Sequence, residues 1–287
     1  MHPVITPREL AVLLTGPESP AVADVRWSLS GPGRADYQAG HLPGAVFLDM
    51  DSDLAAPPGR DGRHPLPEPA ALQATLRAAG ISATTPVVAY DAADSSIAAR
   101  LWWLLRWVGH PAVAVLDGGI AAWRAAGLPV TVDVPRPQPG TITVRPGAMP
   151  VIDASQAAAL ARDGVLLDAR IAPRYRGETE PVDPRAGHIP GAANAPLREL
   201  TDAQGRWLPP TRLRELARQW AVGGAEGIGG AEVGAYCGSG INACSLVLGL
   251  ERAGVTEPER PAALYAGSWS QWCTDPARPG ATGPDPG

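Results

Sequence analysis

Short runs of apolar residues alternate along this chain with longer segments in which apolar positions recur at helical spacing. The runs at 166–169, 233–236 and 262–265 are typical of buried strands, and the segments 69–79, 98–108 and 211–220 are typical of helices. Strands that alternate with helices pair in parallel, with the helices on the faces of the sheet. The pattern therefore predicts an α/β fold whose reactive groups lie in loops at the carboxyl ends of strands.

The chain also repeats itself. The sequence Ala-Gly-His-Leu-Pro-Gly-Ala at 39–45 returns as Ala-Gly-His-Ile-Pro-Gly-Ala at 186–192, an offset of 147 residues. Three further stretches match in the same order, namely 22–26 with 166–170, 87–91 with 233–237, and 117–123 with 266–272. A repeat of this length indicates a tandem duplication of one domain, each copy a parallel sheet flanked by helices.

Proline and glycine mark the expected boundaries. We expect a first domain at 1–132, a linker at 133–149, a second domain at 150–275 and a tail at 276–287. The tail is rich in proline and glycine, so we expect it to be poorly ordered. The Gly-rich stretch 223–230 is expected to be a surface insertion without an assigned function.

Composition excludes several classes of function. The chain has 287 residues, enough for two domains, and a net charge of −5 with no basic cluster, so neither nucleic acid nor an anionic membrane is an expected partner. It begins with no signal-peptide pattern and contains no apolar stretch of membrane-spanning length. Three cysteines without disulfide or metal-ligand spacing indicate a cytoplasmic protein, and we expect no metal and no organic cofactor.

The stretch from Cys237 to Cys244, Cys-Gly-Ser-Gly-Ile-Asn-Ala-Cys, is the strongest candidate for chemistry. It lies between a predicted strand and a predicted helix, where glycines let backbone N–H groups turn toward the sulfur and the helix N-terminus adds positive charge. Such surroundings lower a thiol pKa to roughly 3.5–7.5 and make it a nucleophile. An inert buried cysteine is the alternative, and we favour it for Cys244 and Cys273.

These residues resemble the two-domain rhodanese family of sulfurtransferases over essentially the whole chain. The landmarks are the repeated Gly-His-Ile/Leu-Pro-Gly-Ala box, Asp-Ala-Arg at 168–170, and Gly-Ser-Trp at 267–269. The Cys-Gly-Ser-Gly loop is similar to that of the 3-mercaptopyruvate branch. The resemblance implies a catalytic second domain and a first domain without the nucleophile, where Asp91 occupies the position of Cys237.

The resemblance also implies a set of site residues. Cys237 would accept sulfur as a persulfide, and Ser239, Asp51 and His64 would handle protons. Arg174 and Arg185 would hold the carboxylate of an α-keto acid donor, for which planar guanidinium groups are suited. The loop residues that would surround the persulfide are Gly238, Gly240, Ile241 and Asn242. Asn242 departs from the Thr or Ser usual in the family, and an amide donor replaces the hydroxyl.

The resemblance implies transfer of sulfur from 3-mercaptopyruvate to cyanide, a small thiol or thioredoxin. The uncharged loop favours this monoanionic donor over the thiosulfate dianion, which would gain from cations inside the loop. Thiosulfate:cyanide transfer remains an alternative, as does a non-catalytic sulfur carrier or anion-binding module. A phosphatase on this fold would need an arginine six residues after the nucleophile, and Ala243 occupies that position.

Overall fold

A parallel sheet forms in each half of the chain, as the alternation of strands and helices predicts. The computed structural model describes residues 2–220 and 232–287, so the Gly-rich stretch 223–230 lies outside the described residues. The chain divides into two units, which are considered separately below. The first comprises Met1–Ala56, Leu66–Met149 and Asp202–Trp207, and the second comprises Pro57–Pro65, Pro150–Thr201 and Leu208–Gly287.

In the first unit, the described strands form a five-stranded sheet in the order β1-β7-β6-β2-β5, with every neighbouring pair parallel. The strands are β1 (Val4–Ile5), β2 (Ala21–Asp24), β5 (Ala45–Phe47), β6 (Val87–Tyr90) and β7 (Val113–Leu116). The helices are α1 (Pro7–Leu14), α2 (Arg34–Ala39), α3 (Pro69–Ala78), α4 (Ala98–Trp107) and α5 (Gly119–Ala125). An antiparallel hairpin of β3 (Trp27–Ser28) and β4 (Gly31–Pro32) precedes α2.

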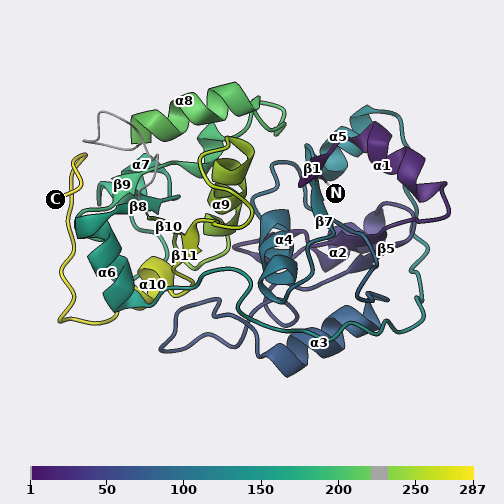
Figure 1. Ribbon diagram of the computed structural model, residues 1–287, viewed down its shortest axis with the longest axis horizontal. Coiled ribbons are helices and arrows are strands. Elements are labelled where there is room, and N and C mark those ends of the chain that lie inside the picture. The colour runs from purple at the N-terminus through teal and green to yellow at the C-terminus, as the bar shows by residue number, and fades with distance from the viewer. Residues whose placement is uncertain (1, 221–231) are drawn as a thin grey trace. The chain divides into compact units, whose positions relative to one another are not determined.

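In the second unit, the described strands form a four-stranded parallel sheet in the order β11-β10-β8-β9 (Figure 1). The strands are β8 (Val165–Asp168), β9 (Ala193–Asn194), β10 (Val233–Tyr236) and β11 (Ala263–Leu264). The helices are α6 (Ala154–Asp163), α7 (Ala172–Tyr175), the 3-10 helix η1 (Leu197–Glu199), α8 (Pro210–Trp220), α9 (Ala243–Arg252) and α10 (Ser268–Trp272). Helix α9 packs on β10 and β11, and α8 packs against α9.

The two sheets have the same topology. Strands β7, β6, β2 and β5 correspond in order to β11, β10, β8 and β9, and a parallel bridge from Val151 to Leu264 takes the place of β1. Helices α4 and α9 follow the equivalent strands β6 and β10, and each helix consists largely of buried residues. The duplication inferred from the sequence and its α/β fold are confirmed.

The tail is hydrogen-bonded to the repeated box of the second unit. The His188 ring stacks on Tyr175 with centroids 3.8 Å apart, and its backbone exchanges two hydrogen bonds with Ala281, each 2.9 Å long. The Gly191 N–H donates to the carbonyl of Pro286 at 2.7 Å. These hydrogen bonds pair the backbone of the tail with the box, and the poor order expected from its composition remains a prediction.

The first unit uses an equivalent segment in the same way. The His41 ring stacks on Tyr37, and its backbone pairs with Thr131 through two bonds of 2.9 Å. Its Nε2 lies 3.1 Å from the carbonyl oxygen of Asp133. Residues 133–149 belong to the first unit, and Ile142 among them is buried. The domain boundaries expected from the sequence remain a prediction.

None of the helices in residues 2–220 and 232–287 combines the length and the apolarity that crossing a bilayer requires.

Removing residues 276–287 is expected to destabilise the second unit. The truncation deletes the backbone partners of His188 and Gly191, and each buried hydrogen bond contributes roughly 0.5–1.5 kcal/mol. We expect a loss of about 2–5 kcal/mol in the free energy of unfolding, measured by urea denaturation. A chain that ends at Pro286 keeps these partners and serves as the control. Equal stability of the two truncated chains would contradict the prediction.

Candidate active site

Cys237 lies directly after β10, and residues 237–242 connect this strand to the start of α9. The N–H of Gly240 donates to the Cys237 Sγ at 3.1 Å. Gly240 has a φ of +82°, and a side chain there would overlap the carbonyl oxygen of Ala266. Only glycine therefore allows the turn that brings this N–H to the sulfur. Cys237 itself is 3% exposed, so its surroundings are largely dry.

Ser268, the first residue of α10, holds the backbone of Cys237. Its Oγ accepts a bond from the Cys237 N–H at 3.1 Å and lies 4.0 Å from the Sγ. Ser268 is fully buried and has a φ of +52°, which is unfavourable for a residue with a side chain. The equivalent residue of the first unit is Gly119, with a φ of +53°. The second unit thus carries a hydroxyl where the backbone favours glycine.

A serine and a histidine pair beside the nucleophile. The Ser239 Oγ lies 2.8 Å from the Nδ1 of His64, and both residues are buried. His64 comes from the first half of the chain but belongs to the segment 57–65 of the second unit. The preceding residue, Arg63, anchors this segment by donating its backbone N–H to the Ser270 Oγ at 3.1 Å. The segment that carries His64 is therefore fixed through its backbone at the preceding residue.

Arg174 is oriented by two carboxylates. Its Nε and Nη2 donate to Glu180 at 3.2 and 2.6 Å, and Nη2 also contacts Asp183 at 3.1 Å. Burial disfavours the charged form of Glu180, but its bonds from Arg174 and from backbone N–H groups outweigh burial and lower its pKa. Burial raises the pKa of Asp183, although the charges of Arg63 and Arg174 oppose the shift. Neither Glu180 nor Asp183 was predicted from the sequence to belong to the site.

Arg185 contacts Arg278 and Trp269, and its Nε and Nη2 are buried without a hydrogen-bond partner among the described residues. Its Nη1 donates to the carbonyl oxygen of Arg278 at 2.8 Å, and its guanidinium lies over the Trp269 ring, 5.6 Å from the centroid. Trp269 in turn donates its backbone N–H to the carbonyl oxygen of Cys237 at 3.0 Å. Arg185 is thus connected to Cys237 through Trp269. Its expected role in donor binding remains a prediction.

The other expected residues differ in what they contact. Asp51 belongs to the first unit, where its carboxylate accepts bonds from the Trp27 Nε1 at 3.0 and 3.1 Å. Its role in a Ser-His-Asp set remains a prediction. Ile241 is buried, as are Cys237 and Ser239 in the same turn. Asn242 immediately precedes α9, and its side chain does not cap that helix.

The equivalent turn of the first unit encloses a carboxylate. Asp91, directly after β6, accepts four backbone N–H bonds of 2.9–3.1 Å. The donors are Ala93, Ser95, Ile97 and Ala98. The turn is one residue longer than its counterpart, since α4 begins at Ala98 and α9 at Ala243. The same backbone device therefore surrounds an anionic side chain in the first unit and a thiol in the second.

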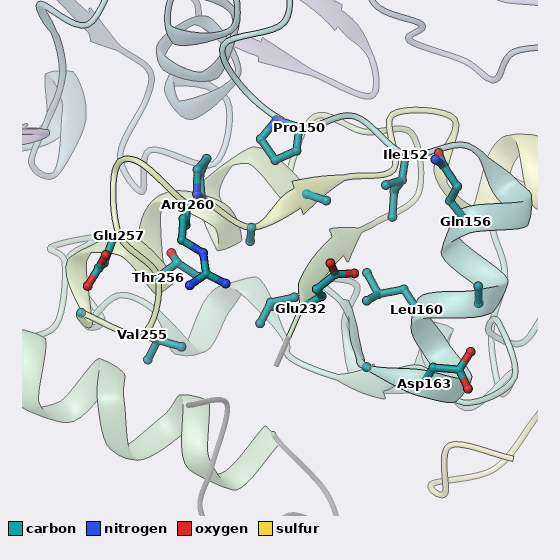
Figure 2. Close-up of a pocket in the computed structure, with 17 residues that line it drawn as sticks. Pro150, Ile152, Gln156, Leu160, Asp163, Glu232, Val255, Thr256, Glu257 and Arg260 are labelled. Carbon is teal, nitrogen blue, oxygen red and sulfur yellow. The ribbon is translucent and has the colours of Figure 1, made fainter. Parts of the chain in front are cut away.

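The second unit contains a cavity of about 810 Å³ (Figure 2), and Cys237 is not among the residues that line it. Its lining includes Val233 and Ala263, the first residues of β10 and β11, whereas Cys237 follows the last residue of β10. Glu232 and Arg260 are among its polar residues. Within the described ranges, no group of three or more His, Cys, Asp or Glu residues is placed to hold a metal ion.

The fold is a duplicated α/β arrangement in which Cys237 lies at the carboxyl end of a strand of the second sheet. The family model of the rhodanese-like domain matches residues 6–126 and 153–275, so the chain belongs to the rhodanese-like family. It is 45% identical over 287 residues to a probable 3-mercaptopyruvate sulfurtransferase of Pseudomonas aeruginosa, covering 98% of each chain. A putative thiosulfate sulfurtransferase, SseB of Mycobacterium tuberculosis, is 42% identical over 96% of this chain and 95% of its own.

Among solved structures, the chain is similar to SseA of Escherichia coli, titled a 3-mercaptopyruvate sulfotransferase with the rhodanese fold. The TM-score is 0.79 at 27% identity, covering 94% of this chain and 100% of SseA. This likeness agrees with the two parallel sheets described above.

Two residues of the site that were not predicted have a recognisable signal in the sequence. Ser268 aligns with Gly119 in the repeat, so a serine at a position that favours glycine was visible in the sequence. Arg63 directly precedes His64, which was already a candidate. Glu180 and Asp183 lie between Arg174 and Arg185 and carried no signal beyond that proximity.

Glycine is expected to be tolerated better than alanine at Ser268. Both substitutions remove the hydroxyl, but alanine keeps a side chain at a left-handed φ, which costs roughly 1–2 kcal/mol. The free energy of unfolding of Ser268→Gly should therefore exceed that of Ser268→Ala by about 1 kcal/mol. Ser245, buried within α9, is the control, and there alanine should be the more stable choice. The same ranking at both positions would refute the argument.

Asp91 should make the stability of the first unit depend on pH. Burial, and then the nearby Asp94 charge, raise its pKa to about 6 against the N–H bonds of the turn. The folded protein thus binds a proton more tightly than the unfolded chain, so stability falls as pH rises from about 4 to about 6 and is flat above. Asp91→Asn lacks this slope. The test is urea unfolding of the wild type and of Asp91→Asn between about pH 4 and about pH 6. If the free energy of unfolding depends on pH in the same way in the two proteins, the prediction is contradicted.

Proposed function

We propose that this protein is a sulfurtransferase that moves a sulfane sulfur from 3-mercaptopyruvate to a thiol or to cyanide through a persulfide on Cys237. The observation that carries the proposal is the position of this thiol, in an uncharged strand-to-helix turn with the Gly240 N–H on its sulfur. The relatives named as sulfurtransferases support the same class of reaction and the use of small sulfur donors.

In the first half of the reaction, the Cys237 thiolate attacks the sulfur of the donor. The new S–S bond forms as the C–S bond of mercaptopyruvate breaks, and the electron pair of that bond leaves as the enolate of pyruvate. A proton then converts the enolate to pyruvate. In the second half, an acceptor nucleophile attacks the outer sulfur and restores the thiolate. A covalent intermediate of this kind gives ping-pong kinetics.

The turn stabilises the charge on the persulfide. Backbone N–H donors fixed before the reaction stabilise a developing anion without reorganisation, as in an oxyanion hole. The first unit supports this role, since the equivalent turn binds the Asp91 carboxylate through four N–H groups. The residues we assign to it are Gly238, Gly240, Ile241 and Asn242, together with the N-terminus of α9.

The pair of Ser239 and His64 supplies the proton. Their 2.8 Å contact lets the imidazole and the hydroxyl exchange a proton beside the thiol, and histidine titrates near neutral pH. In our proposal the hydroxyl of Ser239 protonates the leaving enolate and is reprotonated through His64. Asp51 would be the third member of this set.

The donor preference follows from charge. Residues 238–242 carry no charge, and Arg174 beside them is already paired with Glu180 and Asp183. A thiosulfate dianion gains less from such a site than a monoanionic α-keto acid, which needs directed donors for its carboxylate. Thiosulfate remains the second candidate donor because SseB, at 42% identity, is named a putative thiosulfate sulfurtransferase. Cyanide, a small thiol and thioredoxin are the proposed acceptors.

The test is the mass of Cys237 after mixing with donor, followed by turnover. With 3-mercaptopyruvate the protein should gain about 32 mass units on Cys237, and a thiol acceptor should remove them repeatedly. Cys237→Ser should lose transfer by about a thousandfold or more, while Cys244→Ser and Cys273→Ser keep most of it. A higher kcat/KM for thiosulfate would favour the second donor, and persulfide without turnover would indicate a carrier. An active Cys237→Ser protein would end the proposal.

A further inference from the structure

The segment 57–65 brings a second arginine to the turn of the second unit. Arg63 is fixed at its backbone by the bond to the Ser270 Oγ, and the next residue, His64, contacts Ser239. The backbone carbonyl of Gly238 accepts a bond from the Ser270 N–H at 2.9 Å. Arg63 is therefore held next to the residue that follows the nucleophile.

Two guanidinium groups approach Gly238. A Cβ atom at this glycine would lie 3.1 Å from the Nη2 of Arg63 and 3.3 Å from the Nη1 of Arg174. The absence of a side chain at Gly238 leaves both nitrogen atoms close to the backbone beside Cys237. The Nη2 of Arg63 and the Nη1 of Arg174 therefore both lie close to the same residue of the turn, Gly238.

Asp183 sets the orientation of both groups. One of its carboxylate oxygens pairs with the Nη1 of Arg63, and the other lies 3.1 Å from the Nη2 of Arg174. Glu180 binds Arg174 on the same edge at 2.6 Å. Among the described residues, Arg63 Nη2 and Arg174 Nη1 have no hydrogen-bond partner in the protein, and the Nε of Arg63 is buried without one.

The charges of the group are balanced. Arg63 and Arg174 carry two positive charges, and Glu180 and Asp183 carry two negative charges. Such a group offers N–H donors in a fixed geometry without a large positive field. It suits a single carboxylate, which accepts two or more such bonds, better than a dianion that depends on net charge.

We propose that Arg63 is a donor-binding residue that, with Arg174, grips the carboxylate of the α-keto acid donor. This inference rests on the proposed function and adds Arg63 to the two arginines, Arg174 and Arg185, that the sequence assigned to the donor. Arg185 uses its Nη1 for the carbonyl oxygen of Arg278 and lies over Trp269, while its Nε and Nη2 are buried without a hydrogen-bond partner among the described residues.

The binding test uses pyruvate, the product that carries the same carboxylate. Calorimetric titration should show a Kd about tenfold higher for Arg63→Gln than for the wild type, and an intermediate Kd for Arg63→Lys, which keeps the charge but not the planar fork. Arg176→Gln is the matched control, since Arg176 lies on the other side of Tyr175 and pairs with Glu178 near the surface. Equal pyruvate affinity of Arg63→Gln and wild type, or no pyruvate binding by the wild type, would overturn the proposal.

Kinetics separate this role from a structural one. Loss of a carboxylate contact should raise the KM for 3-mercaptopyruvate about tenfold with a smaller change in kcat, and should affect the thiosulfate KM less. A kcat loss equal for both donors, with an unchanged KM, would mean that Arg63 only holds His64 in place, and would also overturn the proposal. Failure of the wild type to form a persulfide would instead refute the proposed function, while the pyruvate titration still decides the role of Arg63.

Discussion

The turn after β10, whose backbone directs the N–H of Gly240 at the Cys237 sulfur, is the constraint on which the second unit depends. A negatively charged sulfur in a dry position is costly unless donors surround it, and Cys237 is 3% exposed. The turn meets this requirement through Gly240, whose left-handed backbone directs its N–H at the sulfur. The first unit meets the same requirement for Asp91 with four N–H bonds. The two turns thus share a geometry in which backbone N–H groups point at the side chain that follows the strand, a thiol in one copy and a carboxyl group in the other.

The two arginines and two carboxylates around the turn supply N–H donors in fixed directions, and their charges sum to zero. Arg174 is held by Glu180 and Asp183, and Asp183 also holds Arg63. A buried arginine without such partners would be costly and mobile, whereas a paired one presents its remaining N–H groups at a fixed angle. The carboxylates thus fix the geometry at the expense of electrostatic attraction. That balance distinguishes a site for a directed monoanion from one for a dianion, and it agrees with the absence of charge at 238–242.

The fold was predictable because its determinants are local or repeated. The apolar runs at 166–169 and 233–236 correspond to β8 and β10, and the repeated box fixes the register of the two copies. The contacts of the tail could not be predicted, because proline and glycine content reports on backbone freedom and not on tertiary hydrogen bonds such as that between Ala281 and His188. The contact between Arg63 and Asp183 could not be predicted from the sequence, because the two residues are 120 positions apart. They meet because residues 57–65, although they lie in the first half of the chain, belong to the second unit.

Comparison of the two copies separates residues that hold the fold from residues that serve the site. Positions that hold the fold are the same in both: Asp24 with Arg26 corresponds to Asp168 with Arg170, and each arginine bonds the glycine carbonyl of its box, at 2.9 and 2.7 Å. Among the positions that differ are two at the turn of the second unit, where Cys237 and Ser268 occupy the places of Asp91 and Gly119. Ser268 is the most telling of these, because its left-handed backbone would be relieved by glycine. A strained residue at the one place where its hydroxyl reaches the Cys237 N–H is best explained by the chemistry of that cysteine and not by the stability of the fold.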